Sequence, residues 1–157
     1  MLPIKSLLVL FSYHHKNTEK VAKVFAKVLD AQIKTPKQIN PDELQNYDLI
    51  GFGSGIYRDT HHKSLLDLAD KIPQVTNRKA FIFSTSAMMG EDKVAKDHSI
   101  LRKKLQFKGY TILGEFTSKG FNTNSFLKYF GGMNRGRPNT EDLKHAREFA
   151  QRLKQSL

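Results

Sequence analysis

A short polar segment between an apolar run and a helical pattern contains the side chains best suited to bind an anion. It reads SYHHKNTEK from Ser12 to Lys20 and brings hydroxyl, imidazole, ammonium and amide groups to the start of a helix. The unpaired N–H groups and the dipole of a helix N-terminus both stabilise a bound anion. A phosphate group is therefore the natural occupant, and the simpler interpretation is an ordinary helix N-cap by Asn17 or Thr18.

Two later segments combine small polar residues with apolar side chains that could enclose a ligand. GSGIYRDTHH, residues 53–62, offers glycines that let a ligand approach the backbone closely, followed by Ile56 and Tyr57 as apolar walls. STSAMMG, residues 84–90, places three hydroxyl residues before two methionines. Polar groups beside apolar walls suit a planar heteroaromatic ring, although methionine and tyrosine more often pack in a core.

The elements that must position these segments alternate between strands and helices. Apolar runs rich in β-branched and aromatic residues predict strands at Ile4–Phe11, Asp48–Phe52, Ala80–Phe83 and Tyr110–Phe116, with a candidate edge strand at Ala31–Thr35. Apolar stripes at helical spacing predict helices within residues 21–29, 65–72, 94–105 and 143–153. This alternation requires right-handed crossovers and predicts a doubly wound α/β fold, with helices on both faces of a mostly parallel sheet. No linker or repeat interrupts the pattern, so residues 1–157 are expected to form a single domain.

One connection is much longer than a simple loop requires. Residues 117–139 read TSKGFNTNSFLKYFGGMNRGRPN, and loops of this length are usually functional or disordered. The aromatic residues in this segment favour a packed loop. Pro138, Asn139 and Thr140 mark the start of the last helix, with Glu141 and Asp142 in its first turn. Because ligands bind beyond the carboxyl ends of parallel strands, this loop and the three segments above are expected to share one site.

The order of these motifs carries a family resemblance. SYHHKNTE after the first strand, GSGIY after the third, STSAMMG after the fourth, and GFNT with GGMNRGRPN before the last helix resemble the flavodoxin-like family of FMN proteins. The likeness covers essentially the whole chain. It implies a five-stranded parallel sheet of order 2-1-3-4-5, with FMN bound where the strand order reverses.

The resemblance also assigns the residues expected to bind FMN, and it implies neither a catalytic side chain nor a metal. Ser12, His14, Asn17 and Thr18 would line the phosphate, and His15 and Lys16 would add positive charge. Ile56 and Tyr57 would lie against one side of the isoalloxazine ring, and Ser54 and Gly55 would supply backbone contacts to its N5. The other edge of the ring would meet Thr85, Ser86, Ala87, Met88, Met89 and Gly90, with Phe121 and Asn122 as further walls.

Composition limits the environment and the partners of the protein. Lys and Arg outnumber Asp and Glu by 26 to 15, which gives a net charge of +11. This charge favours encounter with acidic proteins, nucleic acid or anionic lipid, although a simply solvated lysine-rich surface gives the same count. For an electron-transfer protein it suggests a redox partner protein with an acidic surface. The chain contains no cysteine, which excludes disulfides and cysteine-ligated clusters. No apolar run approaches the length of a membrane span, and we expect a cytoplasmic protein.

Three functions fit these observations, and electron transfer between partner proteins through FMN ranks first. The second is an FMN-dependent oxidoreductase acting on a quinone or porphyrinogen-like substrate. It is favoured because GSGIYRDTHHKSL is similar to a loop of the menaquinone-dependent protoporphyrinogen dehydrogenases. Lys128, Arg135 and Arg137 could then meet substrate carboxylates. A basic nucleic-acid-binding module that has lost its cofactor ranks last, so nucleic acid is not an expected partner.

Three further patterns favour structural rather than functional interpretations. The glycines at 51, 53 and 55 lack the spacing of a dinucleotide fingerprint. His61 and His62 would diverge by about 100° on a helix, which disfavours a metal pair. His98 interrupts an apolar stripe, and we expect a partly buried histidine whose hydrogen bonds are satisfied.

Overall fold

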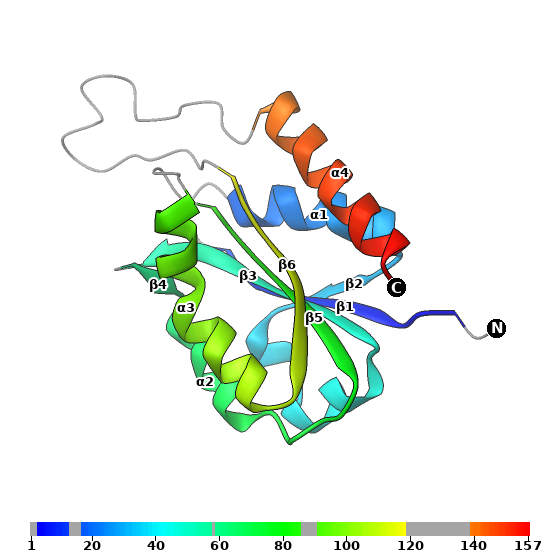
Figure 1. The fold of residues 1–157 in the computed structure, drawn as a ribbon, viewed down its shortest axis with the longest axis vertical. Helices are drawn as coiled ribbons and strands as arrows, with labels where there is room; N and C mark the ends of the chain where they lie inside the picture. Colours follow the sequence, from blue (N-terminus) through cyan, green and yellow to red (C-terminus); the bar gives the residue numbers. More distant parts are fainter. Residues whose placement is uncertain (1–2, 13–16, 58, 86–90, 119–138) are drawn as a thin grey trace.

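A parallel sheet separates two layers of helices (Figure 1). The computed structural model describes residues 3–12, 17–57, 59–85, 91–118 and 139–157. The strands are β1 (Ser6–Phe11), β2 (Gln32–Lys34), β3 (Leu49–Tyr57), β4 (Thr60–His61), β5 (Arg78–Thr85) and β6 (Tyr110–Ser118). The α-helices are α1 (Asn17–Leu29), α2 (Lys63–Lys71), α3 (Glu91–Phe107) and α4 (Thr140–Gln155), and short 3₁₀ helices η1 (Pro36–Gln38) and η2 (Pro41–Asn46) follow β2.

The strand order confirms the predicted topology. The sheet runs β2-β1-β3-β5-β6 with every neighbouring pair parallel, and β4 pairs with β3 in the antiparallel direction. Numbered among the parallel strands alone, this is the order 2-1-3-4-5. The sequence did not predict β4, and it ended the third strand at Phe52 instead of Tyr57.

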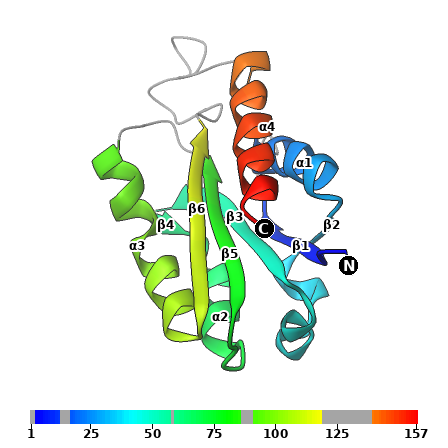
Figure 2. The same ribbon diagram turned by 45° about the vertical axis from the view of Figure 1, so that its right-hand side comes forward.

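Successive side chains of each strand point to opposite faces of the sheet, so the core has two parts, one on each face. On β1, Leu7 and Val9 pack with α2 and α3, whereas Leu8 and Leu10 pack with α1 and α4. The apolar stripe of each helix covers the corresponding face, as the predicted patterns require. Figure 2 shows β6 at the edge of the sheet, between α3 and α4.

Local sequence signals set the helix ends that position these layers. Asn139 caps α4, because its side chain accepts a hydrogen bond from the Asp142 N–H and the Asp142 carboxylate accepts one from the Asn139 N–H. The predicted start of the last helix is therefore confirmed. Gly109, between α3 and β6, has φ of +101°, and a Cβ there would lie 2.0 Å from the carbonyl oxygen of Val75. Only glycine fits this turn.

Two glycines of β3 are explained by packing against β5. An added Cβ at Gly51 would lie 2.3 Å from the Phe81 ring, and one at Gly53 would lie 2.2 Å from the Phe83 ring. The phenylalanine rings therefore occupy the space above both glycines. The prediction that Gly53 lets a ligand approach the backbone is wrong for this reason. At Gly55 the nearest ring atom is 3.5 Å from an added Cβ, an ordinary contact.

Candidate functional site

The carboxyl ends of β3, β5 and β6 bring three small polar residues into one row, beside Phe11 of β1. In the strand register, Phe11 on β1 lies beside Ser54 on β3, Ser54 beside Ser84 on β5, and Ser84 beside Thr117 on β6. The next residues along the strands pair Gly55 with Thr85 and Thr85 with Ser118. Predicted site residues from the second and third segments therefore meet at this edge of the sheet.

The first segment joins the same edge through the start of α1. Thr18, in the first turn of α1, is buried, and its hydroxyl oxygen lies 2.9 Å from the hydroxyl oxygen of Thr85. The hydroxyl oxygen of Ser12 accepts a longer hydrogen bond, 3.4 Å, from the backbone N–H of Glu19. The N-terminus of α1 and the end of β5 are thus joined directly, and Thr18 bonds to another segment rather than acting only as a local cap.

The end of β3 forms a β-hairpin with β4 rather than an open loop. Ile56 pairs with His61 and Tyr57 with Thr60, so residues predicted as a ligand-binding loop extend the sheet. The Ser54 hydroxyl donates to the carbonyl oxygen of Gly55 at 2.6 Å and accepts from the backbone N–H of His62 at 2.9 Å. These two bonds fix the backbone at Gly55, where FMN contacts are predicted.

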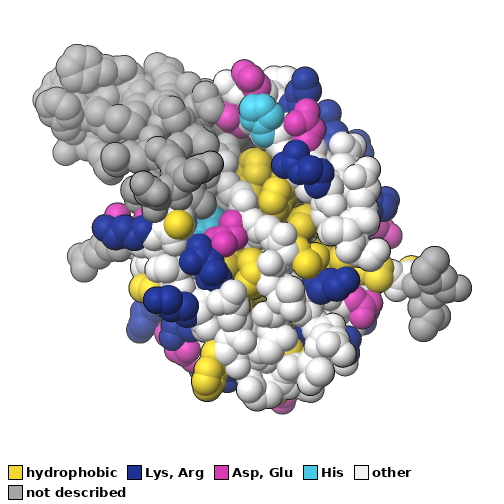
Figure 3. All heavy atoms as spheres, in the orientation of Figure 1, with side chains coloured by type: hydrophobic (Ala, Val, Ile, Leu, Met, Phe, Trp, Pro, Cys, Tyr) yellow, Lys and Arg dark blue, Asp and Glu magenta, His cyan; other side chains and the backbone are white. Residues whose placement is uncertain are grey.

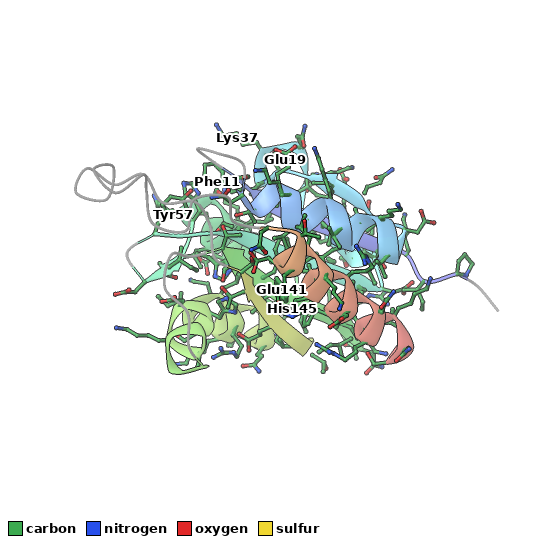
Figure 4. The ribbon with its side chains drawn as sticks, turned by 90° about the horizontal axis from the view of Figure 1, so that it is seen from above. Phe11, Glu19, Lys37, Tyr57, Glu141 and His145 are labelled. Atoms are coloured by element: carbon green, nitrogen blue, oxygen red, sulfur yellow. The ribbon has the colours of Figure 1, made fainter. Side chains whose placement is uncertain are left out.

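Aromatic side chains line an open cavity beside the hairpin. The rings of Phe11 and His62 stack with centroids 3.6 Å apart, and the Tyr57 ring lies edge-on to both, at 6.4 and 5.2 Å. Figure 4 shows Phe11 and Tyr57 close together, with Glu19 nearby on α1. The cavity has a volume of about 740 Å³ and is lined by Phe11, Tyr57, Thr60, His61, His62, Lys63 and Leu66.

The two adjacent histidines have different structural roles and do not lie on a helix. His62 caps α2, because its Nδ1 accepts a hydrogen bond from the Ser64 N–H. Burial lowers its pKa, and the charge of Asp67 opposes this shift. His61 lies on β4 and is 1% exposed. Among the described residues, no three His, Cys, Asp or Glu side chains are grouped to hold a metal ion.

Burial keeps His61 neutral. Its Nε2–H donates to the carbonyl oxygen of Phe83 at 2.9 Å, so Nδ1 is the atom that an added proton would occupy. Nδ1 is itself buried. Desolvation, followed by the charge of His98, lowers the pKa of His61 to about 3, and the bond to Phe83 offsets only part of this shift.

A second buried histidine links α3 to the row of hydroxyl residues. His98 is fully buried, with Nε2 2.7 Å from the Ser84 hydroxyl and Nδ1 2.9 Å from the Glu115 carboxylate. This confirms the expectation of a satisfied histidine. The Arg102 guanidinium donates to both oxygens of Glu115 at 2.8 Å. Glu115 and Arg102 were not predicted as partners of His98, although Glu115 is a charged residue within an otherwise apolar strand pattern.

Several predicted FMN contacts lie outside the described residues, and these assignments remain predictions. They are His14, His15 and Lys16 of the first segment, Ser86, Ala87, Met88, Met89 and Gly90 of the third, and Phe121 and Asn122 of the long connection. The structure brings together Ser12, Asn17, Thr18, Ser54, Gly55, Ile56, Tyr57 and Thr85 around the carboxyl edge. No helix in the described part of the chain is long and apolar enough to cross a membrane.

Solved structures share this architecture over nearly the whole chain. Oxidised flavodoxin 1 from Bacillus cereus matches with a TM-score of 0.70 and 22% identity, covering 98% of this chain and 99% of that one. A Fusobacterium nucleatum flavodoxin bound to flavin mononucleotide matches with a TM-score of 0.68 and 12% identity, covering 98% and 99%. At these identities the likeness establishes the fold.

Comparison of sequences identifies a relative and a family for this chain. An uncharacterised protein of Methanocaldococcus jannaschii is 49% identical over 150 residues, covering 96% of this chain and 98% of that protein. The sequence family described as the flavodoxin domain matches residues 8–132, most of the chain. With this match and the observed strand order, the chain belongs to the flavodoxin domain family.

Proposed function

We propose that this protein binds FMN and carries electrons between partner proteins. The observation that carries this proposal is the Thr18–Thr85 hydrogen bond, which joins the start of α1 to the end of β5 at the carboxyl edge. Membership of the flavodoxin domain family supports the same cofactor. FMN would supply the redox chemistry, and the protein would set its potential through contacts and local charge.

The groups at this edge match the chemistry of FMN. Ser12 and Thr18 place hydroxyl groups beside the start of α1, where the helix dipole favours a phosphate. Tyr57 supplies a flat aromatic surface on the hairpin. An added Cβ at Gly55 would make only ordinary van der Waals contacts, all with the Tyr57 ring, so Gly55 and the flat surface of Tyr57 belong to one part of the site.

Net charge supports an acidic partner. The chain carries a formal charge of +11, and Figure 3 shows Lys and Arg side chains distributed over the face that it displays. Opposite charge on a partner would increase the rate of encounter, with an effect that weakens as salt is added. We propose that the electron donor or acceptor presents an acidic surface.

We expect the protein to bind one FMN, and Thr18→Val to weaken that binding about thirtyfold. The substitution removes a hydroxyl group from the phosphate region and breaks the bond to Thr85, and losing a hydrogen bond to a charged group costs about 2 kcal/mol. Affinity is measured by the quenching of FMN fluorescence on titration. Thr111→Val, at an exposed position on β6, is the matched control and should leave the affinity unchanged. A wild-type protein that does not bind FMN would overturn the proposed function.

The open cavity favours a second candidate, an FMN-dependent oxidoreductase acting on a quinone or porphyrinogen-like substrate. The Phe11, His62 and Tyr57 rings offer planar apolar surfaces, and Lys63 lies at the start of α2, where an anionic substituent would be stabilised. The FMN-loaded protein would then oxidise or reduce a soluble quinone repeatedly under steady-state conditions. Leu66→Trp, which fills the cavity, should lower that turnover more than tenfold while FMN stays bound. Turnover unaffected by Leu66→Trp would contradict a substrate site in this cavity.

A further inference from the structure

His62, beside the aromatic cavity, is held through both its backbone and its ring. Its backbone N–H donates to the Ser54 hydroxyl oxygen at 2.9 Å, and its carbonyl oxygen accepts from the Leu65 N–H at 3.0 Å. Its ring stacks on Phe11, with centroids 3.6 Å apart and the two planes 8° from parallel. Because the backbone and the ring are both fixed, the ring nitrogens of His62 hold fixed positions at the cavity wall.

The helix cap at His62 also determines which ring nitrogen carries the proton. The backbone N–H of Ser64 donates to Nδ1 at 3.1 Å, and a backbone N–H can only donate. The Ser64 hydroxyl lies 2.8 Å from the same nitrogen and can donate to it as well. Nδ1 therefore presents its lone pair, and the proton of the neutral ring lies on Nε2. Burial lowers the pKa of His62 against the charge of Asp67, which favours this neutral form. Among the described residues, none accepts a hydrogen bond from Nε2.

The other polar groups of the cavity make its lining rich in hydrogen-bond donors. Lys63 contributes an ammonium group, which can only donate; its side chain is 85% exposed and lies 3.9 Å from Asp67. The Thr60 hydroxyl oxygen and Nδ1 of His61 could accept, but both atoms are buried. The Tyr57 hydroxyl can donate or accept. No carboxylate is among the described residues that line the cavity. A ligand whose polar atoms accept hydrogen bonds therefore matches this lining.

We propose that the cavity binds a quinone, and that Nε2–H of His62 donates a hydrogen bond to one of its carbonyl oxygens. The inference rests on the second candidate function proposed above, and it selects a quinone over a porphyrinogen-like substrate. A quinone is flat and its polar groups only accept, so it matches both the Phe11 and Tyr57 rings and the donor. A porphyrinogen carries pyrrole N–H groups, which would face another donor.

The same hydrogen bond would assist reduction of the bound quinone. Reduction adds two electrons, supplied by the reduced cofactor, and two protons from water, and it yields a hydroquinone. Negative charge develops on the carbonyl oxygen during this step, and a donor already in place stabilises that charge. His62 keeps its own proton throughout, because loss of the proton from Nε2 of a neutral ring would leave an anion.

The tautomer of His62 is tested without any ligand. Long-range ¹H–¹⁵N NMR of the imidazole rings in the wild-type protein at pH 7.5 should show a proton on Nε2 of His62 and none on Nδ1. The signal is assigned by its loss in His62→Asn. A proton on Nδ1 would overturn the inference, because the helix cap would then not define the donor.

Two matched ligands measure the hydrogen bond itself. 1,4-Naphthoquinone has carbonyl oxygens, and naphthalene has the same fused rings without them. Equilibrium dialysis against the FMN-saturated protein gives the affinity for each. His62→Asn keeps the cap of α2, because asparagine is a favoured N-cap residue, and His62→Phe keeps a ring against Phe11. Neither variant has Nε2–H, so both should weaken binding of naphthoquinone relative to naphthalene about fivefold.

The comparison of ligands separates the hydrogen bond from damage to the cavity. Loss of the ring or of the helix cap changes the affinity for both ligands, whereas loss of the donor changes only that for the quinone. His145→Gln, at an exposed position on α4 (Figure 4), should leave the ratio of the two affinities unchanged. An unchanged ratio in both His62 variants, or quinone binding that FMN abolishes, would overturn the inference.

This inference and the proposed electron-transfer function can fail separately. If the wild-type protein binds no FMN, the electron-transfer function fails, while dialysis without FMN still decides whether His62 holds a quinone carbonyl. If the protein binds FMN and the ratio of affinities is the same in wild type and both His62 variants, the electron-transfer function stands and this inference fails.

Discussion

Lowering the pH from 7 to 5 should reduce the free energy of unfolding by about 2 kcal/mol through His61 alone. The pKa of His61 is lowered to about 3 in the folded protein, whereas in the unfolded chain it has its ordinary value of 6.5. The unfolded state therefore binds a proton first as the pH falls. Stability from this group is complete above pH 6.5 and decreases continuously down to about pH 3. Urea unfolding at a series of pH values measures how the free energy of unfolding changes with pH.

His61→Gln should remove most of this pH dependence. A glutamine amide can still donate to the Phe83 carbonyl, but it cannot take up a proton in the unfolded state. The variant should therefore lose less stability than the wild type between pH 7 and pH 5. His145→Gln, which changes an exposed histidine, should keep the wild-type slope. An equal slope in His61→Gln and wild type would show that another group causes the acid sensitivity.

Glu115→Gln should lower the free energy of unfolding at pH 7 by about 3 kcal/mol. Partial burial alone would raise the pKa of Glu115, but hydrogen bonds from His98 and Arg102, and the charge of Arg102, lower it to about 2. The ionised carboxylate is thus stabilised by folding. Replacing it with an amide leaves two buried or half-buried donors facing a weaker acceptor.

The stability that Glu115→Gln removes should depend on pH, because folding lowers the pKa of the Glu115 carboxyl group. The contribution of Glu115 is complete above about pH 4.5 and is lost as the pH falls toward 2, because in this range the unfolded state binds the proton while the folded carboxylate is still ionised. The free energies of unfolding of Glu115→Gln and the wild type should therefore differ less at pH 3 than at pH 7. Glu43→Gln, at an exposed position of η2, should change stability by less than about 0.5 kcal/mol. If the free energies of unfolding of Glu115→Gln and the wild type differ by the same amount at every pH, Glu115 does not stabilise the fold through its charge.

Periodicity predicted the parts of the fold that depend on burying apolar surface. The apolar stripes placed the helices, and the alternation of strands and helices predicted a doubly wound, mostly parallel sheet. The order 2-1-3-4-5 was implied by the resemblance to the flavodoxin-like family, and the strand pairing confirms it. The β3–β4 hairpin was missed because its second strand has only Thr60 and His61, too short to produce an alternating pattern. The same hairpin explains why the third strand continues past its predicted end at Phe52 to Tyr57.

The sequence predicted where the candidate site lies in the fold, but not the hydrogen bonds within it. The chain order and the rule that ligands bind beyond the carboxyl ends of parallel strands predicted that Thr18, Ser54 and Thr85 lie at one site. The bonds that connect them depend on register, which no local pattern specifies. His98, Glu115 and Arg102 were not linked because their contacts join a helix to a strand across 13 to 17 residues of chain. A histidine within the apolar stripe of the third helix pattern and a carboxylate within an apolar strand pattern were the signals in the sequence.

The interlocked glycines and phenylalanines of β3 and β5 constrain how this sequence can diverge. The Phe81 ring fills the space where a side chain at Gly51 would lie, and the Phe83 ring does the same at Gly53. A larger residue on β3 can be accommodated only when its partner on β5 becomes smaller. Among homologues, each pair should therefore covary, and a Gly53→Ala, Phe83→Leu double variant should be more stable than the sum of its single substitutions predicts. The coupling lies in the packing of two neighbouring strands, so it should persist in relatives that have changed the cofactor site.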